Sequence, residues 1–227
     1  MKRLQIFLSA LFLTLFFLNV IQAKSAMSPK NKVILFDFEN VPIGQIPEGW
    51  QIEVTNPKGP LPVWKVVEDS TAPSGKKVLA LVDTKKSFGN AYNLCWTPGI
   101  PFMNGEISVN FKANSGREDE GGGVIWRAKD RNNYYIARFN PLEDNFRLYY
   151  VKNGVRRMLA SAHIALKAHV WHSMKIIVHG DKFEGYLNGK KLLSVSSHVF
   201  DEAGGVGLWT KADAATSFDN FKVILER

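Results

Sequence analysis

The stretch from Gly121 to Gly154 constrains the fold of this chain more than any other part of the sequence. It contains three runs rich in Val, Ile, Phe, Tyr and Trp, which read GVIWRA, NYYIARF and NFRLYYV. Each run is bounded by Asp, Asn, Pro or Gly, which favour turns, whereas the residues inside the runs favour strands. The stretch therefore predicts three consecutive antiparallel strands.

The side chains of these three strands separate into two faces, because successive residues of a strand point to opposite sides. One face is apolar and aromatic and is expected to line a core: Val124, Trp126, Tyr135, Ala137, Phe139, Phe146, Leu148 and Tyr150. The other face combines aromatic rings with polar and charged groups: Arg127, Tyr134, Arg138, Asn140, Arg147 and Tyr149.

The rest of the chain repeats the same short-strand pattern. EISVNFKAN alternates strictly between apolar and polar residues, and Asn188-Gly189 is a strong hairpin signal between two alternating runs. Pro98-Gly99 and Asn104-Gly105 predict further turns, and Ala160 to Lys167 is a short helix candidate. Many short strands separated by turns predict an all-β, two-sheet antiparallel sandwich of the jelly-roll type.

The N-terminus reads as a targeting segment. Lys2 and Arg3 precede a Leu- and Phe-rich run that ends near Ala23, which predicts a signal peptide over residues 1–23. A flexible lead-in is expected over residues 24–32 and the jelly-roll domain over 33–227. The predicted location is the periplasm or the extracellular space. The alternative is a retained membrane anchor, since the run is near the ~17–25 residues that a membrane span requires.

Charge and cysteine content limit the possible partners. The net charge is +8, of which Lys2 and Arg3 contribute two, and the other basic residues are scattered along the chain. A nucleic-acid-binding domain would cluster them, so no nucleic-acid partner is predicted. Cys95 is the single cysteine and lies between Leu94 and Trp96, which indicates a buried packing residue in a chain without an internal disulfide. We expect a monomer with no transmembrane span after signal cleavage.

The order of several segments resembles the concanavalin-A-like jelly rolls. These segments are FDFEN, GGGVIWRAKDRNNYY, RLYYVKNG, VWHSMKIIVHGDKFEGYLNGKKL and GGVGLWTKADAATSFDNFKV, and together they run from about Val33 to Arg227. The chain is similar in particular to the laminin-G-like and 3-keto-disaccharide hydrolase domains of exported bacterial proteins. The resemblance implies two curved antiparallel sheets with a concave face that often binds carbohydrate, and it implies catalysis in only some relatives.

The polar and aromatic face is the best candidate for a binding site. Sugars stack on aromatic rings, and their hydroxyls bind planar donors such as the guanidinium of Arg. The alternative is a ladder of Arg and Tyr side chains that merely covers an exposed sheet. The predicted ligand-binding residues are Arg127, Tyr134, Arg138, Asn140, Arg147, Tyr149, Trp209 and Lys211.

Catalytic residues are not identified by the sequence. Sugar hydrolysis usually needs two carboxylates a few ångströms apart, and no strand of the Glu-x-Asp-x-Glu type is present. Asp37 and Glu39 alternate correctly, but Phe36 and Phe38 flank them on the terminal strand. Glu118-Asp119-Glu120 is a run in a Gly-rich loop, where side chains are not expected to line up. An enzyme would have to use Glu184, His172 or a metal for acid–base chemistry.

A calcium site is a further hypothesis. Asp37 and Glu39 on the first strand and Asp219 on the last are expected to meet, because the terminal strands of such sandwiches commonly pair. Carboxylate oxygens suit Ca²⁺, with backbone carbonyls completing the shell. The alternative is that these acids are ordinary polar groups at a sheet edge.

These observations lead to one function with two alternatives. The chain is expected to be an exported carbohydrate-binding β-sandwich that uses its concave face and has no chemistry of its own. The first alternative is a glycoside hydrolase or lyase that acts on 3-keto-glycosides. The second is a structural or interaction domain of the cell envelope. Fold alone does not decide among them.

Overall fold

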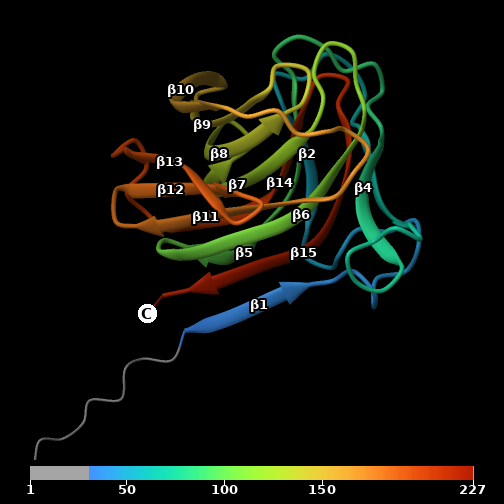
Figure 1. Ribbon diagram of the computed structural model, residues 1–227, viewed down its shortest axis with the longest axis horizontal. Coiled ribbons are helices and arrows are strands. Elements are labelled where there is room, and N and C mark those ends of the chain that lie inside the picture. Colours follow the sequence, from blue (N-terminus) through green and yellow to red (C-terminus); the bar gives the residue numbers. More distant parts are fainter. Residues whose placement is uncertain (1–30, 227) are drawn as a thin grey trace, which may run out of the picture.

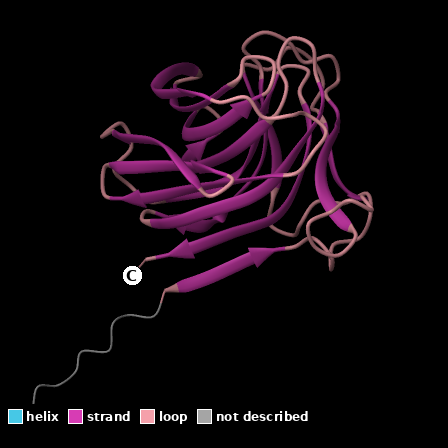
Figure 2. Ribbon diagram, viewed as in Figure 1, coloured by secondary structure: helices cyan, strands magenta, loops and turns pink. Residues whose placement is uncertain are grey.

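The computed structural model describes residues 31–226, and within them every regular element is a β-strand (Figures 1 and 2). The expected signal peptide and most of the expected lead-in lie outside the described residues. The first strand begins at Lys32, one residue before the predicted start. The strands are β1 (Lys32–Phe36), β2 (Gln51–Thr55), β3 (Val63–Glu68), β4 (Lys77–Asp83), β5 (Tyr92–Phe102), β6 (Gly105–Ser115), β7 (Gly122–Asp130), β8 (Asn133–Asn140), β9 (Asn145–Lys152), β10 (Val155–His163), β11 (His172–His179), β12 (Lys182–Leu187), β13 (Lys190–Ser196), β14 (Gly204–Lys211) and β15 (Ala215–Leu225).

The strands form two antiparallel sheets that stack as a sandwich. The eight-stranded sheet has the order β13-β12-β11-β6-β15-β4-β3, with β1 added beside β15. The seven-stranded sheet has the order β10-β9-β8-β7-β14-β5-β2. The predicted all-β, two-sheet architecture is confirmed, and the three strands predicted between Gly121 and Gly154 are β7, β8 and β9.

The core fills the space between the two sheets, as the alternation predicts. On β6, Ile107, Val109 and Phe111 are buried, whereas the residues between them face outward and are partly exposed. The eight inward-facing residues predicted on β7, β8 and β9 all belong to this core or pack against it. The apolar face of the central strands was therefore predicted correctly.

Strand β1 runs beside β15 (Figure 1). The hairpin between β12 and β13 forms at the Asn-Gly turn that the sequence predicts. Asn188 and Gly189 both have positive φ, of 48° and 78°, between β12 and β13. A two-residue turn with positive φ at both positions matches the right-handed twist of a hairpin, and Asn-Gly tolerates it best.

Two local predictions were wrong. Ala160 to His163 form the end of strand β10 rather than a helix, because pairing with β9 overrides the helix propensity of alanine and leucine. Pro98 and Gly99 lie inside β5 rather than at a turn, next to a register irregularity where β5 pairs with β14. Proline is tolerated at such an irregularity because a hydrogen bond of the ladder is already missing there.

Cys95 is completely buried in β5, as predicted. Burial raises the pKa of its thiol well above the ordinary value. The thiol is therefore protonated and shielded in the folded chain.

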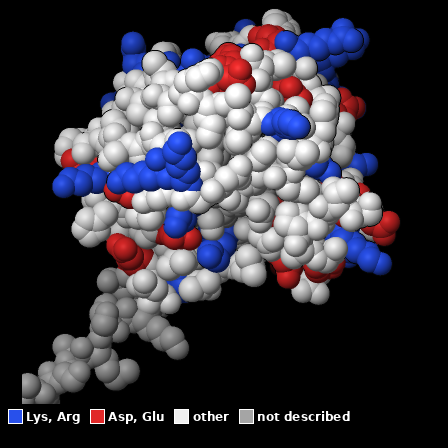
Figure 3. All heavy atoms as spheres, viewed as in Figure 1, with Lys and Arg blue, Asp and Glu red and all other residues white. Residues whose placement is uncertain are grey.

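Two features of the surface bear on partners. No helix within residues 31–226 is long and apolar enough to cross a membrane. Charged side chains of both signs are interspersed over the face seen in Figure 3.

Candidate functional site

The outer face of the seven-stranded sheet is concave. Arg156 on β10 lies over the ring of Tyr92 on β5, with its guanidinium carbon 5.1 Å from the ring centroid, although five strand spacings separate the two strands. A flat sheet would hold them about 24 Å apart. At the same face, the hydroxyl oxygens of Thr55 on β2 and Tyr134 on β8 are 2.7 Å apart. The sheet must therefore curl so that its two ends approach each other across this face, which we call the concave face.

Aromatic and aliphatic side chains fill the floor of the concave face. Tyr134, Ile136 and Trp209 are completely buried although they point away from the main core. Gly123 lies in register between Arg138 and Trp209, and a Cβ there would come within 1.8 Å of the Ala137 carbonyl oxygen. Only glycine fits at this position, so the backbones pack closely beneath the rings.

A charged cluster lies beside this floor. Arg138 is 1% exposed, and its Nη2 donates to Glu143 Oε2 at 3.0 Å. The same Glu143 oxygen accepts from Arg147 Nη1 at 3.0 Å and from Asn145 Nδ2 at 2.8 Å. Arg138 and Arg147 are directly opposite on β8 and β9, where like charges repel. Glu143 lies between the two guanidinium groups and offsets that repulsion.

Asp119 adds a buried carboxylate to the cluster. Its Oδ2 accepts from Lys211 Nζ at 3.0 Å, and its Oδ1 accepts from Asn140 Nδ2 at 3.1 Å. Burial raises the pKa of Asp119, and the charges of Arg138 and Lys211 oppose that shift without cancelling it. The loop that carries Asp119 is held by Asp213, whose carboxylate accepts from the backbone N–H of Asp119 and of the two preceding residues.

Several buried polar atoms of this cluster have no hydrogen-bond partner among the described residues. They are Nε and Nη1 of Arg138, Nη1 of Arg156 and Oδ1 of Asn145. Buried polar groups in proteins are nearly always satisfied, by protein groups or by ordered water. The free N–H groups of Arg138 can therefore take a water or a ligand, and the cluster is a candidate binding site.

The structure brings seven of the eight predicted ligand-binding residues to the concave face or to its rim. They share the face because the alternation on β8, β9 and β14 is regular. They are Tyr134, Arg138, Asn140, Arg147, Tyr149, Trp209 and Lys211.

Arg127 is the exception. The pairing of β7 with β8 is irregular between Trp126 and Asp130, and Arg127 has a φ of 47°. Its guanidinium donates to the backbone carbonyl oxygens of Met103 at 2.9 Å, Phe200 at 2.8 Å and Gly180. Arg127 thus ties three connecting segments together at the edge of the sandwich, away from the concave face, and the predicted facing of this residue was wrong.

The expected calcium ligands are only partly brought together. β1 ends at Phe36, so Asp37 and Glu39 follow the strand rather than lie on it. Glu39 accepts from the backbone N–H of Lys76 and Lys77, and Asp219 accepts from the backbone N–H of Ser74. Glu39 and Asp219 therefore hold the same loop by hydrogen bonds. Residues 31–226 contain no group of three acidic, histidine or cysteine side chains arranged to hold a metal ion.

Glu184 and His172 lie on the eight-stranded sheet rather than at the concave face. Glu184 accepts from Tyr186 and Lys191, and these two hydrogen bonds lower its pKa. His172 contacts the backbone oxygen of Lys167 and the side chain of Asn188. Glu184 pairs with Ile177, toward the other end of β11 from His172, so the two do not form one acid–base site.

Sequence reasoning missed the residues that loops and edges bring to the concave face. Asp119 and Glu143 come from loops, and Arg156 comes from the edge strand β10. Glu53 on β2 accepts from the indole N–H of Trp96 at 3.0 Å. The acidic run around Asp119 was a usable signal, because three carboxylates beside a Gly-rich turn need partners wherever the loop packs.

Comparison with known proteins places the chain in a family. Residues 32–224 match the family model of the 3-keto-alpha-glucoside-1,2-lyase-like domain. The chain belongs to this family. The predicted resemblance to the 3-keto-disaccharide hydrolase domains is thereby confirmed.

Individual proteins are similar to the chain in sequence or in fold. A Bacillus subtilis levanase is 26% identical over 137 residues, which is 60% of this chain but 19% of the levanase. The carbohydrate-binding module CBM66 from Bacillus subtilis superposes with a TM-score of 0.60 and 20% identity, covering 80% of this chain and 99% of the module. A Bacteroides ovatus GH16 protein superposes with a TM-score of 0.59 and 12% identity, covering 85% and 99%.

Proposed function

We propose that this chain is a carbohydrate-binding domain whose concave face holds a glycan. The observation that carries the proposal is the cluster of Arg138, Glu143, Arg147, Asp119 and Lys211, which is partly exposed at its rim and whose buried Arg138 has N–H donors without a hydrogen-bond partner among residues 31–226. Its family membership and its fold similarity to a carbohydrate-binding module support the same class of ligand.

The geometry divides the cluster into groups that contact the sugar and groups that position them. The side chains of Arg147 and Glu143 are 30% and 42% exposed, and that of Lys211 is 16% exposed. These three are accessible to the hydroxyls of a sugar. Arg138 and Asp119 lie beneath them and fix their positions through the shared carboxylate of Glu143 and the ion pair with Lys211.

The test is a glycan array followed by calorimetric titration of the best ligand. Arg147→Met and Lys211→Met each remove one charge at the rim but keep the length of the side chain. Each is expected to weaken binding at least about tenfold, because a hydrogen bond to a charged group contributes roughly 1.5–3 kcal/mol.

The matched control is Lys129→Met. Lys129 lies on β7 of the same sheet but pairs with Glu202, outside the cluster, and is 42% exposed. It should bind like the unaltered chain. Equal affinity in all three folded variants, or no glycan bound at all, would refute the proposal.

A second candidate is a lyase acting on 3-keto-glycosides, and the family match over residues 32–224 is the observation that favours it. A 1,2-elimination needs a base to take the C2 proton next to the keto group while the bond from C1 to the glycosidic oxygen breaks and the leaving oxygen is protonated. Asp119 has a raised pKa and is the candidate base at the concave face, but it can contact a substrate only where the bound sugar displaces Lys211, which covers it.

The lyase candidate is tested by following a 3-keto disaccharide with the protein by NMR. An elimination would give a sugar with a new C1–C2 double bond together with the released alcohol, and Asp119→Asn should abolish it. Hydrolysis would instead give two intact sugars. Binding of the keto sugar without any change in it would leave the binding domain as the sole proposal.

A further inference from the structure

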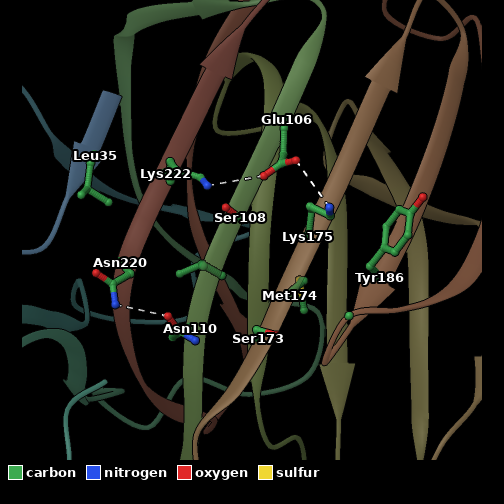
Figure 4. A pocket seen from close by; sticks show the side chains of 12 residues that line it. Leu35, Glu106, Ser108, Asn110, Ser173, Met174, Lys175, Tyr186, Asn220 and Lys222 are labelled. Atoms are coloured by element: carbon green, nitrogen blue, oxygen red, sulfur yellow. Dashed lines mark hydrogen bonds and ion pairs between the residues drawn. The ribbon is translucent and has the colours of Figure 1, made fainter. Parts of the chain in front are cut away.

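A hollow of about 440 Å³ lies on the outer face of the eight-stranded sheet, on the opposite side of the molecule from the concave face (Figure 4). It is bordered by β1, β15, β6, β11 and β12. We call it the Ser108 hollow, after the residue at its centre. Its volume falls in the range of pockets that bind small molecules, roughly 300–1,000 Å³.

The hollow exists because short side chains occupy the centre of the face. Lys222, Ser108, Lys175 and Tyr186 are register partners on four neighbouring strands, so a serine lies between two lysines. In the next row Asn110 is opposite Ser173, which is also short. The long side chains around these positions rise above them and form the wall.

A break in the pairing of β15 with β6 adds an amide to the floor. The register shifts between Asp219 and Lys222, and Asn220 has a φ of 51°. Asn220 Nδ2 donates to Asn110 Oδ1 at 3.3 Å, so that both amides lie together in the floor of the hollow. The Asp-Asn pair in the sequence is the local signal for this irregularity, since asparagine tolerates a positive φ.

The two ion pairs of the hollow are long. Figure 4 shows Lys175 and Lys222 pointing toward Glu106 from either side, and the N···O distances are 3.5 and 3.8 Å. Both exceed hydrogen-bond length. The hydroxyls of Ser108 and Ser173 make no side-chain hydrogen bond to any residue in the described part of the chain. The hollow therefore offers free donors and acceptors side by side.

We infer that the Ser108 hollow is a second binding site, for one or two units of a neutral sugar. Each sugar hydroxyl both donates and accepts, which suits a floor of serine and asparagine beside alternating ammonium and carboxylate groups. Leu35 and Tyr186 lie at opposite ends of the hollow, and Leu35 supplies apolar surface for the C–H groups of a sugar ring, whereas the ammonium of Lys175 lies over the ring of Tyr186, 4.9 Å from its centroid. A strongly anionic ligand fits less well, because Glu106 already lies between the two lysines.

The test is an NMR titration of the isotopically labelled full chain with glucose, fructose, sucrose and glucuronate as separate probes. Saturable shifts of the backbone amides of Ser108 and Lys175 are expected with at least one of the three neutral probes. Those amides report on this site alone, whereas those of Arg138 and Trp209 report on the concave face. Failure of one site is therefore distinguishable from failure of the other.

Two variants make the test specific. Ser108→Leu fills the centre of the hollow and is expected to weaken binding at this site at least about tenfold. Ser194→Leu is the matched control, because Ser194 is opposite Glu184 on the same sheet, is exposed and does not line the hollow. It should leave the affinity unchanged.

Three outcomes would overturn the inference. They are no shift at Ser108 and Lys175 with any neutral probe, equal weakening by both leucine variants, and a shift with glucuronate only. The last would reassign the hollow to anionic ligands.

Discussion

The two outer faces of this sandwich differ in how far their charged side chains are removed from water. Each is a β-sheet surface that carries aromatic, amide and charged side chains. On the concave face Arg138 is 1% exposed and its ion pair to Glu143 is 3.0 Å long. On the face with the Ser108 hollow, Lys175 is 37% exposed and its nearest carboxylate oxygen is 3.5 Å away. The curvature of the seven-stranded sheet explains this difference in exposure. Curling a sheet excludes water from the inside of the curve, whereas the outer face of the eight-stranded sheet remains accessible to water.

The comparison indicates on which face the binding groups also stabilise the fold. Charges on the concave face are partly desolvated, so each depends on its partner. Charges around the Ser108 hollow remain hydrated and are screened, so their pairing contributes little. Substitutions on the concave face should therefore change folding and binding together, whereas those at the hollow should change binding alone.

The largest expected contrast comes from removing one tyrosine on each face. Tyr134→Ala should lower the free energy of unfolding by about 3–5 kcal/mol, because it empties a fully buried site and leaves the indole N–H of Trp209 without its partner. Tyr186→Ala removes a ring that is only partly buried and should cost about 1 kcal/mol or less. Urea unfolding followed by tryptophan fluorescence measures both. Equal losses would show that curvature does not distinguish the faces.

A smaller contrast is expected from two lysines. Lys211→Met removes the ion pair of the buried Asp119 and should cost about 1–3 kcal/mol. Lys175→Met removes a longer contact between more exposed groups and should cost under about 1 kcal/mol. Adding salt should alter the stability of the unaltered chain little through the first pair, which is shielded from solvent. The comparison fails if the lysine at the hollow proves the more costly of the two.

The smallest contrast concerns pH. Burial raises the pKa of Glu143, but hydrogen bonds from Asn145 and Arg138 and the nearby guanidinium charges outweigh it, so the folded-state pKa is lowered. A lowered carboxyl pKa contributes stability that is present above the unfolded-state pKa of about 4.3 and is lost as pH falls through the folded value. Glu143→Gln should therefore flatten the acid side of the stability curve.

Glu184→Gln provides the comparison on the other face. The pKa of Glu184 is also lowered, by hydrogen bonds from Lys191 and Tyr186, but Lys191 is 46% exposed, whereas Arg138 beside Glu143 is 1% exposed. Its substitution should flatten the acid limb less than Glu143→Gln does. Thermal unfolding between about pH 3 and 6 measures both slopes, and a steeper effect at Glu184 would contradict the ranking of the two faces.

The sequence predicted those parts of the molecule that depend on alternation within a strand. The core residues of β7, β8 and β9 and seven of the eight ligand-binding candidates lie where a period of two places them. The facing of Arg127 was predicted wrongly because an irregular pairing after Trp126 breaks that period. No residue type in the run indicates this irregularity.

The loop contributions were beyond reach for a different reason. Asp119 and Glu143 meet the concave face only because loops from different parts of the chain fold over the same rim. Their positions depend on long-range contacts, such as the clamp from Asp213, and not on local propensity. The same holds for the Ser108 hollow, where short side chains on β6 and β11 become neighbours only through strand pairing.

The thiol of Cys95 can be used to measure local opening of the sheet. Cys95 lies in the middle of β5, which pairs with β2 on one side and with β14 on the other. The thiol is inaccessible while these strands stay paired. A thiol reagent can react only when that part of the sheet opens. The labelling rate of the native chain, compared with that of the unfolded chain, therefore gives the free energy of opening at the end of the curled sheet formed by β14, β5 and β2. A glycan bound across the concave face would slow that labelling without touching the sulfur.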